Sequence, residues 1–362
     1  MPWTKTTLAL AAVVLATGPG AAAAASGAVR LQQLYQFPNA TQFVENIAIR
    51  PNGQLLLSTF DDGHLFTLDP RQHHGGCGGG DEDEDYAARL VVKVPGVTAL
   101  SGMAEIALDV FAVSGGVSNA SDYSFVAGTA RILTLDFSRR RAAAGGGGGG
   151  DGDAPVVRTA AWLPDAGTLN GMAALPRHPH VVLSADSKTG RVLRTDTATG
   201  RVDVAFADPA LAPPDAATTT TLPPGVPPLG INGLKIHGGF LYLTTTAERV
   251  FARVAIDEWG RPRHGTQPEL ERIAQLSSSA SSPRVPDDFS VARDGTAYVA
   301  THVDALVRVA PDGRWTELVG PDGDVKLDSP TATALTRDEK TLYVVTAGGS
   351  GGKGGQVVAV HL

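Results

Sequence analysis

The chain has 362 residues, of which 43% are hydrophobic, so it can bury the core of one ring-shaped domain or of two ordinary domains. Its formal net charge is −7 and it has no basic stripe, which argues against a nucleic acid as partner. The single cysteine, Cys77, excludes an internal disulfide bond, so stability must come from core burial and from closure of the architecture.

Residues 1–25 have the pattern of a cleavable secretory signal. Lys5 precedes an apolar stretch, and small residues suitable for cleavage follow up to Ala25. The apolar stretch is short for a membrane span, although a membrane anchor is the alternative, and no other run is long enough. We therefore expect a secreted or secretory-lumen protein without stable membrane insertion. Two predicted N-glycosylation sites, Asn39 and Asn119, are consistent with this route.

Six similar segments follow one another from Leu31 to the C-terminus. In each, a polar residue opens an apolar strand, a turn leads to a second β-rich strand, and a third strand often ends in Asp. The segments VENIAIRPNGQLLLSTFDDGHLFTLDP and INGLKIHGGFLYLTTTAERVFARVAID show this order. Further strands, such as ARLVVKVPG, lie between the copies. About four short strands in each of six units predict an all-β fold, a six-bladed β-propeller over residues 31–362.

The two ends of the chain are expected to close the ring. The last copy contains only three clear strands, and LQQLYQF at residues 31–37 is the candidate for its fourth strand. Closure of this kind leaves only short, protected strand edges. Polar, glycine-rich inserts near residues 71–89 and 139–154 are expected to be flexible loops of this single domain.

Four polar residues hold equivalent places at the start of the innermost strands. They are Glu45, Asn170, Asn232 and Asp287. Because inner strands of a propeller converge on the axis, we expect these side chains to meet there. Oxygen donors of this kind suit a hard cation, Ca²⁺ foremost, with Mg²⁺ or Mn²⁺ as alternatives. The competing interpretation is that they are turn and cap residues bonded to their own backbone.

Loop residues on the same face are candidates for contacts with a substrate. His302 follows a second strand and is a candidate proton carrier, with a solvated loop histidine as the alternative. Tyr123, Phe125 and Glu248 occupy similar positions in other loops, where they are predicted to bind substrate.

The motifs that open the blades resemble those of a known superfamily. With Glu45 in VENIAIR, Asn232 in INGLKIHGGFLYLT and Asp287 in PDDFSVARDGTAYVA, the chain resembles the senescence marker protein/gluconolactonase (regucalcin-like) six-bladed propellers. The resemblance implies that these three residues bind a divalent metal, and that Asn170 in LNGMAAL lies near the metal and the substrate. Asn-Ile-Ala follows Glu45 where lactonases usually have Gly-Pro or a similar pair and an aromatic residue. This variant looks more like a secreted fungal branch that includes hetero-Diels–Alder cyclases.

Three functions follow as hypotheses. The first is a monomeric cyclase that joins a polyketide-derived heterodiene to a terpenoid alkene, with Asp287, Glu45 and His302 in the catalytic centre and no nucleotide or redox cofactor. The second is a metal-dependent lactonase or esterase, in which Asp287 is the general base while Glu45 and Asn232 hold the ion. The third is a propeller that binds a small molecule without catalysis.

Overall fold

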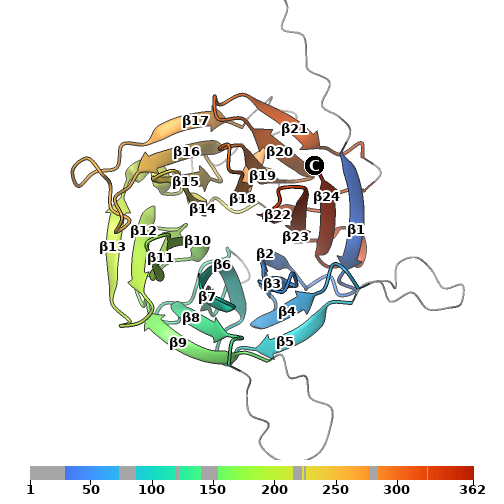
Figure 1. Cartoon of the computed structure of the whole chain (residues 1–362), viewed down its shortest axis with the longest axis horizontal. Coiled ribbons are helices and arrows are strands. Elements are labelled where there is room, and N and C mark those ends of the chain that lie inside the picture. Colours follow the sequence, from blue (N-terminus) through green and yellow to red (C-terminus); the bar gives the residue numbers. More distant parts are fainter. Residues whose placement is uncertain are drawn as a thin grey trace, which may run out of the picture.

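The fold is a ring of six four-stranded antiparallel sheets around a central axis (Figure 1). The computed structural model describes residues 29–72, 87–119, 122–139, 154–214, 222–223, 226–276, 284–323 and 325–362. Six blades built almost without helix confirm the predicted all-β propeller. The predicted secretory signal, Cys77 and most of the two predicted inserts lie outside the described residues. Within the described part of the chain, no helix has the length and apolar character that a membrane span requires.

Each blade runs from an inner strand at the axis to an outer strand at the rim. The inner strands are β2 (Val44–Ile49), β6 (Ala99–Ala107), β10 (Leu169–Leu175), β14 (Ile231–His237), β18 (Val285–Val291) and β22 (Pro330–Leu335). The second strands are β3 (Leu55–Thr59), β7 (Val110–Gly116), β11 (His178–Asp186), β15 (Phe240–Thr245), β19 (Ala297–His302) and β23 (Thr341–Thr346). The third strands are β4 (His64–Leu68), β8 (Arg131–Asp136), β12 (Arg191–Asp196), β16 (Val250–Ala255), β20 (Ala305–Val309) and β24 (Gln356–His361). The outer strands are β5 (Arg89–Lys93), β9 (Val156–Trp162), β13 (Val202–Ala207), β17 (Glu271–Gln275), β21 (Trp315–Val319) and β1 (Arg30–Gln36). The described residues also form two short 3₁₀ helices in loops, η2 (Pro209–Leu211) and η4 (Ser350–Gly352).

The first strand of the chain closes the ring. Strand β1 pairs antiparallel with β24, from Arg30 opposite His361 to Gln36 opposite Gln356, so the sixth blade contains both ends of the described chain. This pairing confirms the predicted closure. Phe37, just after β1, packs edge-on against Phe66 of the first blade at 4.9 Å between ring centroids, which joins the last blade to the first.

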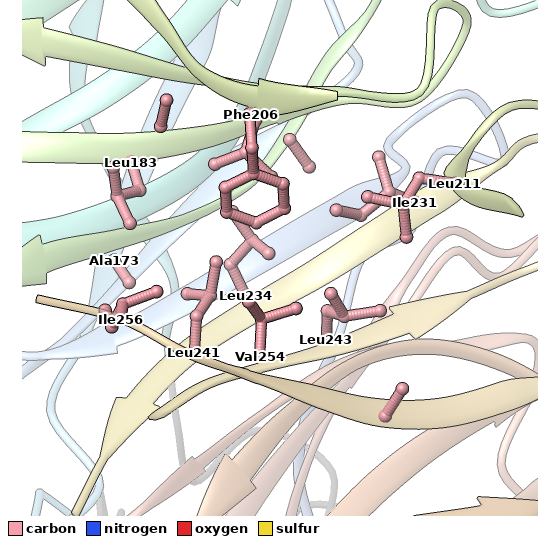
Figure 2. Packing of buried hydrophobic residues seen from close by; sticks show 14 of the residues in the cluster. Ala173, Leu183, Phe206, Leu211, Ile231, Leu234, Leu241, Leu243, Val254 and Ile256 are labelled. Atoms are coloured by element: carbon pink, nitrogen blue, oxygen red, sulfur yellow. The ribbon is translucent and has the colours of Figure 1, made fainter. Parts of the chain in front are cut away.

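The hydrophobic core lies between the faces of neighbouring blades. Strands such as β3, with the sequence LLLST, are buried along their whole length because another blade covers each face. Figure 2 shows one such layer, where Leu183 and Phe206 of the third blade face Leu234 and Leu243 of the fourth. The stacked blades thereby hold the inner strands in fixed positions around the axis.

A serine or threonine hydroxyl also crosses every junction between neighbouring blades. Each donates a hydrogen bond to a backbone carbonyl on the inner strand of the next blade in chain order. The bonds run from Ser58 to Ser101 (2.8 Å), Ser101 to Leu169 (2.7 Å), Ser187 to Ile231 (2.6 Å), Thr244 to Asp287 (2.7 Å), Ser290 to Thr333 (2.9 Å) and Thr331 to Val44 (2.7 Å). Buried carbonyl groups need a hydrogen-bond donor, and these hydroxyls supply one to each inner strand. The same bonds fix the spacing between neighbouring inner strands.

Candidate functional site

Each inner strand carries a β-bulge near its start. The pairing register shifts at Val44/Asn46, Leu100/Met103, Leu169/Met172, Ile231/Leu234, Pro286/Phe289 and Pro330/Ala332. A bulge inserts an unpaired residue, bends the strand and redirects the side chain. Glu45, Asn170, Asn232 and Asp287 all lie within these bulges. Their shared orientation therefore comes from a repeated backbone irregularity.

The Asn-Gly pairs of the third and fourth blades belong to these bulges. A Cβ atom on Gly171 would lie 2.5 Å from the carbonyl oxygen of Asn232, and one on Gly233 would lie 2.6 Å from a carboxylate oxygen of Asp288. No side chain fits at such a distance, so glycine is required where one bulge touches the next. The close approach brings the side chains of successive blades together on the axis.

The four bulge residues line one cavity on the axis, with a volume of about 260 Å³. The others that line it come from loops on the same face and, for His302, from the end of strand β19: Phe43, Phe60, Tyr123, Thr168, Val226, Pro227, Leu229, Thr246, His302, Val303, Ser329, Ala347 and Gly348. The cavity has a polar floor and a mostly apolar wall, which is the usual construction of a small-molecule site.

His302 and Asp287 form a pair in this cavity. Nε2 of His302 lies 2.8 Å from Oδ2 of Asp287, and both side chains are largely buried. Burial raises the pKa of Asp287, while the hydrogen bond and the charge of His302 act in the opposite direction. His302, the last residue of β19, thus faces the cavity rather than solvent.

Glu45 is only 5% exposed, and no described residue donates a hydrogen bond to its carboxylate. Burial raises the pKa of Glu45 well above its usual range, and the negative charges of Asp287 and Asp288 raise it further. Without a bound cation, this environment favours the protonated acid, which is a hydrogen-bond donor. The energetic cost of a buried carboxylate is therefore avoided by protonation or by a ligand with positive charge.

Two amide oxygens in the floor have no hydrogen-bond partner among the described residues. Oδ1 of Asn170 and Oδ1 of Asn232 are buried and accept no hydrogen bond from the described residues. Nδ2 of Asn232 donates to the hydroxyl of Thr246 at 2.9 Å, which fixes the direction of its amide. Buried acceptors of this kind suit a cation or a donor group on a ligand. No cluster of three or more His, Cys, Asp or Glu with the arrangement of a metal site occurs among the described residues; two of the four donors here are amides.

A second polar network closes the cavity from below. Asp288 accepts hydrogen bonds from Nδ2 of Asn46 at 2.8 Å, from Nζ of Lys235 at 2.5 Å and from the backbone N–H of Phe289 at 2.8 Å. Lys235 also lines a separate opening on the opposite face of the ring. The network therefore separates the two ends of the axis.

Aromatic rings form one side of the cavity wall. Phe43 stacks on Phe60 with a centroid distance of 5.4 Å, and Tyr123 lies 6.0 Å and 6.1 Å from these two rings. Neither phenylalanine was predicted as a site residue. Phe43 directly precedes an inner strand and Phe60 directly follows a second strand, so their places in the repeat are the signal that identifies them.

The structure brings together Glu45, Asn170, Asn232 and Asp287, and it adds His302 from the end of β19 and Tyr123 from a loop. It places two other predicted residues elsewhere. Phe125 is buried behind the wall, 6.3 Å from the ring of Phe60 and against Gly116, and does not line the cavity. Glu248 lines a different cavity of about 230 Å³.

The predicted glycosylation sites differ in how much the structure describes. Asn39 is exposed, and its side-chain oxygen accepts a 3.1 Å hydrogen bond from the backbone N–H of Thr41. Asn119 is described, but the two residues that complete its sequon lie outside the described ranges.

Fold and site together define a six-bladed propeller with an oxygen-lined cavity on its axis. No family model matches the chain. Two curated relatives are described as "Putative hetero-Diels-Alderase": a protein of Phoma sp is 29% identical over 335 residues, 86% of this chain and 85% of its own length. The other, asR5 of Sarocladium schorii, is 26% identical over 362 residues, 92% of this chain and 81% of its own length.

Solved structures of similar fold include two from the superfamily that the blade motifs resemble. A calcium-binding regucalcin of Agrobacterium tumefaciens superimposes with a TM-score of 0.55 at 14% identity, covering 91% of this chain and 95% of its own. A "putative gluconolactonase" superimposes with a TM-score of 0.57 at 10% identity, covering 92% of both chains. These comparisons confirm the predicted resemblance at the level of the fold.

Proposed function

We propose that the protein is a cyclase that joins a conjugated heterodiene to an alkene by a hetero-Diels–Alder reaction in the axial cavity. The observation that carries the proposal is the division of this cavity into a polar floor around Glu45 and an apolar wall that includes Phe43 and Phe60. The sequence similarity to two relatives described as hetero-Diels-Alderases supports it.

Catalysis of this reaction requires that the two reactants be positioned correctly, and it requires no nucleophile. One carbon–oxygen and one carbon–carbon bond form together, a new double bond appears within the former diene, and no atom leaves. Because two molecules become one, holding both in reacting geometry removes much of the entropic barrier. In our proposal, the aromatic wall stacks on the planar heterodiene and the aliphatic residues Val226, Leu229 and Val303 receive the alkene.

The floor supplies electrostatic assistance in this scheme. Protonated Glu45 donates a hydrogen bond to the carbonyl oxygen of the heterodiene, which lowers the energy of the transition state as negative charge grows there. His302 engages the carboxylate of Asp287 through the 2.8 Å hydrogen bond, so Asp287 does not compete with the substrate oxygen for the hydrogen bond that Glu45 donates.

The same floor fits a divalent cation. Glu45, Asn232 and Asp287 would hold it, and the unpartnered oxygen atoms of Asn232 and Asn170 support this assignment. When bound, such an ion polarises a substrate carbonyl as a Lewis acid. Ligation requires Glu45 to be deprotonated, so cation binding should weaken as the pH falls. Calorimetric titration of chelator-treated protein with Ca²⁺ tests cation binding at this site. We expect Asn232→Ala to abolish the heat of binding, and the control variant Asn52→Ala, at an exposed residue, to retain it.

An assay of stereochemistry tests the cyclase proposal. An achiral heterodiene generated in situ is mixed with an excess of an achiral terpenoid alkene, and the rate and the enantiomeric excess of the adduct are measured. The uncatalysed reaction gives a racemic product, so an excess of one enantiomer shows that the adduct forms in the chiral environment of the cavity. We expect Glu45→Gln to lower the rate about tenfold or more, and the exposed carboxylate variant Glu269→Gln to match the wild type. A racemic product formed at the uncatalysed rate contradicts the proposal.

A metal-dependent lactonase is the second candidate. It is supported by the meeting of two carboxylates and two unpartnered amide oxygens, because such a set can bind an ion next to a possible base. In that scheme Asp287 accepts the proton of the attacking water. Incubation with a lactone panel, with and without chelator, separates the two candidates. Fast hydrolysis that chelator abolishes favours the lactonase.

A further inference from the structure

Tyr123 has an unusual backbone conformation for an aromatic residue. Its φ angle is 57°, in the left-handed region that bulky side chains rarely adopt. The surrounding structure must hold such a residue in place, because the conformation costs energy on its own. Since the ring of Tyr123 packs against Phe43 and Phe60, whatever holds this backbone also sets the position of the aromatic wall.

Hydrogen bonds attach residues 123–125, the Tyr123 loop, to the segment before strand β10. The hydroxyl of Thr168 lies 3.0 Å from the carbonyl oxygen of Tyr123 and 2.8 Å from that of Gly167, and it donates to these acceptors. The backbone N–H of Phe125 donates to the carbonyl of Gly167 at 2.7 Å. Gly167 and Thr168 are therefore the anchor of the loop.

A buried carboxylate holds this anchor from behind. Asp186, at the end of β11, is completely buried. It accepts hydrogen bonds from the backbone N–H groups of Gly167 and Thr168, each at 3.1 Å, and from Nη2 of Arg191 at 2.9 Å. Asp186 does not line the axial cavity. Charge-assisted hydrogen bonds to two successive amides leave the anchor little freedom to move.

We propose that Asp186 is a positioning residue: through Gly167 and Thr168 it fixes Tyr123, and with it the aromatic wall that binds the planar substrate. The chain of contacts runs from the ion pair of Asp186 with the partly exposed Arg191 to the anchor, then to the carbonyl of Tyr123, and ends at the cavity. The expected effect of Asp186 on cyclisation rests on the proposed function, whereas its expected effect on the Tyr123 loop does not.

The test uses variants on both sides of the anchor. Thr168→Val removes the hydroxyl while keeping the shape, and Thr168→Ser restores it. Asp186→Asn removes the charge that orders the anchor. Amide hydrogen exchange at Phe125 measures how often the loop detaches from its anchor, and it needs no substrate. We expect exchange about tenfold faster in Thr168→Val and Asp186→Asn, and near wild type in Thr168→Ser. In the cyclisation assay we expect KM to rise about tenfold with a smaller change in kcat, together with lower enantiomeric excess.

The outcomes are distinguishable. If Asp186→Asn does not fold, because Arg191 loses its carboxylate partner, Thr168→Val and Thr168→Ser carry the test. Unchanged exchange at Phe125 in folded Asp186→Asn or Thr168→Val overturns the positioning role, whatever the reaction proves to be. Faster exchange in a protein whose wild type yields only racemic adduct supports the positioning role and rejects the cyclase instead. The proposal is also contradicted if Thr168→Ser, which keeps the hydroxyl, shows the same fast exchange and altered kinetics as Thr168→Val.

Discussion

The side-chain amide of Asn46 donates a 2.8 Å hydrogen bond to the carboxylate of Asp288, and this contact joins the first blade to the fifth. The sixth blade lies between them in the ring, so the bond spans the axis instead of a blade junction. Asn46 follows Glu45 and Asp288 follows Asp287. The contact therefore holds the two bulges that present the carboxylates of the floor at a fixed separation.

The first prediction concerns the cation in this network. Lys235→Met removes the ammonium group from Asp288, which is only 2% exposed, and leaves a buried carboxylate without its ionic partner. Because Lys235 is itself partly exposed, we expect a loss of about 2 kcal/mol in the free energy of unfolding, less than for a fully buried pair. Urea denaturation measures it, with exposed Lys340→Met as the matched control.

A double variant gives the converse of that experiment. Lys235→Met combined with Asp288→Asn has no buried charge to compensate, so it should recover part of the lost stability. Wild-type stability in Lys235→Met alone is the result that would show the ion pair to be unimportant.

The second prediction concerns the pair formed by His302 and Asp287. His302→Phe keeps a planar ring but removes the hydrogen bond, so the buried carboxylate of Asp287 is free to accept the hydrogen bond that Glu45 otherwise donates to the substrate oxygen. We expect the cyclisation rate to fall by roughly 10- to 100-fold. His302→Gln retains a side-chain N–H and should lose less, while exposed His264→Gln should lose nothing. Equal rates for the two His302 variants would refute a role for the hydrogen bond.

The third prediction is a dependence of stability on pH. Burial and nearby negative charge raise the pKa of Glu45 in the folded state, so the folded protein binds this proton more tightly than the unfolded chain. Between the ordinary pKa and the raised one, stability falls as the pH rises, by about 1.4 kcal/mol per pH unit for one group. Below the ordinary pKa this penalty is absent.

Replacement of Glu45 isolates this effect. In chelator-treated protein, Glu45→Gln should gain stability relative to the wild type as the pH rises from about 4 to about 8. Urea unfolding at several pH values provides the comparison. A difference between the two proteins that is constant over this range would mean that the pKa of Glu45 is not raised.

The fourth prediction concerns the route of the protein through the cell, which the structure leaves as a sequence-based expectation. In a eukaryotic secretion host, mature protein should begin after Ala25 and carry a glycan on Asn39, whose side chain is exposed. Asn39→Gln should remove one glycan-dependent band shift in a deglycosylation assay. Intracellular retention with an intact N-terminus would contradict the predicted signal.

The repeat in the sequence was sufficient for the fold because blade geometry depends on local patterns. Apolar strands and turn residues recur in each unit, and LQQLYQF was identified as the closing strand because the last unit lacked one. The same alignment of units selected Glu45, Asn170, Asn232 and Asp287, which occupy equivalent positions in bulges. It gave no indication of Asp288, whose partners Asn46 and Lys235 come from other blades.

Residues in loops were harder to assign than residues in strands. Tyr123 and Phe125 are separated by one residue, yet only Tyr123 lines the cavity, because the ring of Phe125 packs against Gly116. Glu248 follows a second strand just as His302 ends one, but it faces another cavity. A loop has no fixed periodicity, so tertiary contacts alone determine which of its side chains point inward.

The sequence by itself determined the six-bladed ring, its closure by the terminal strands and the polar residues that open four of the blades. Only the tertiary structure decided that His302 bonds to Asp287, that Asp288 joins three blades, and that Asp186 holds the anchor of Tyr123. The physical reason is the range of the interactions. Strand pattern and turn chemistry act between residues close in the chain, whereas these hydrogen bonds join side chains whose distance is fixed by how complete blades pack.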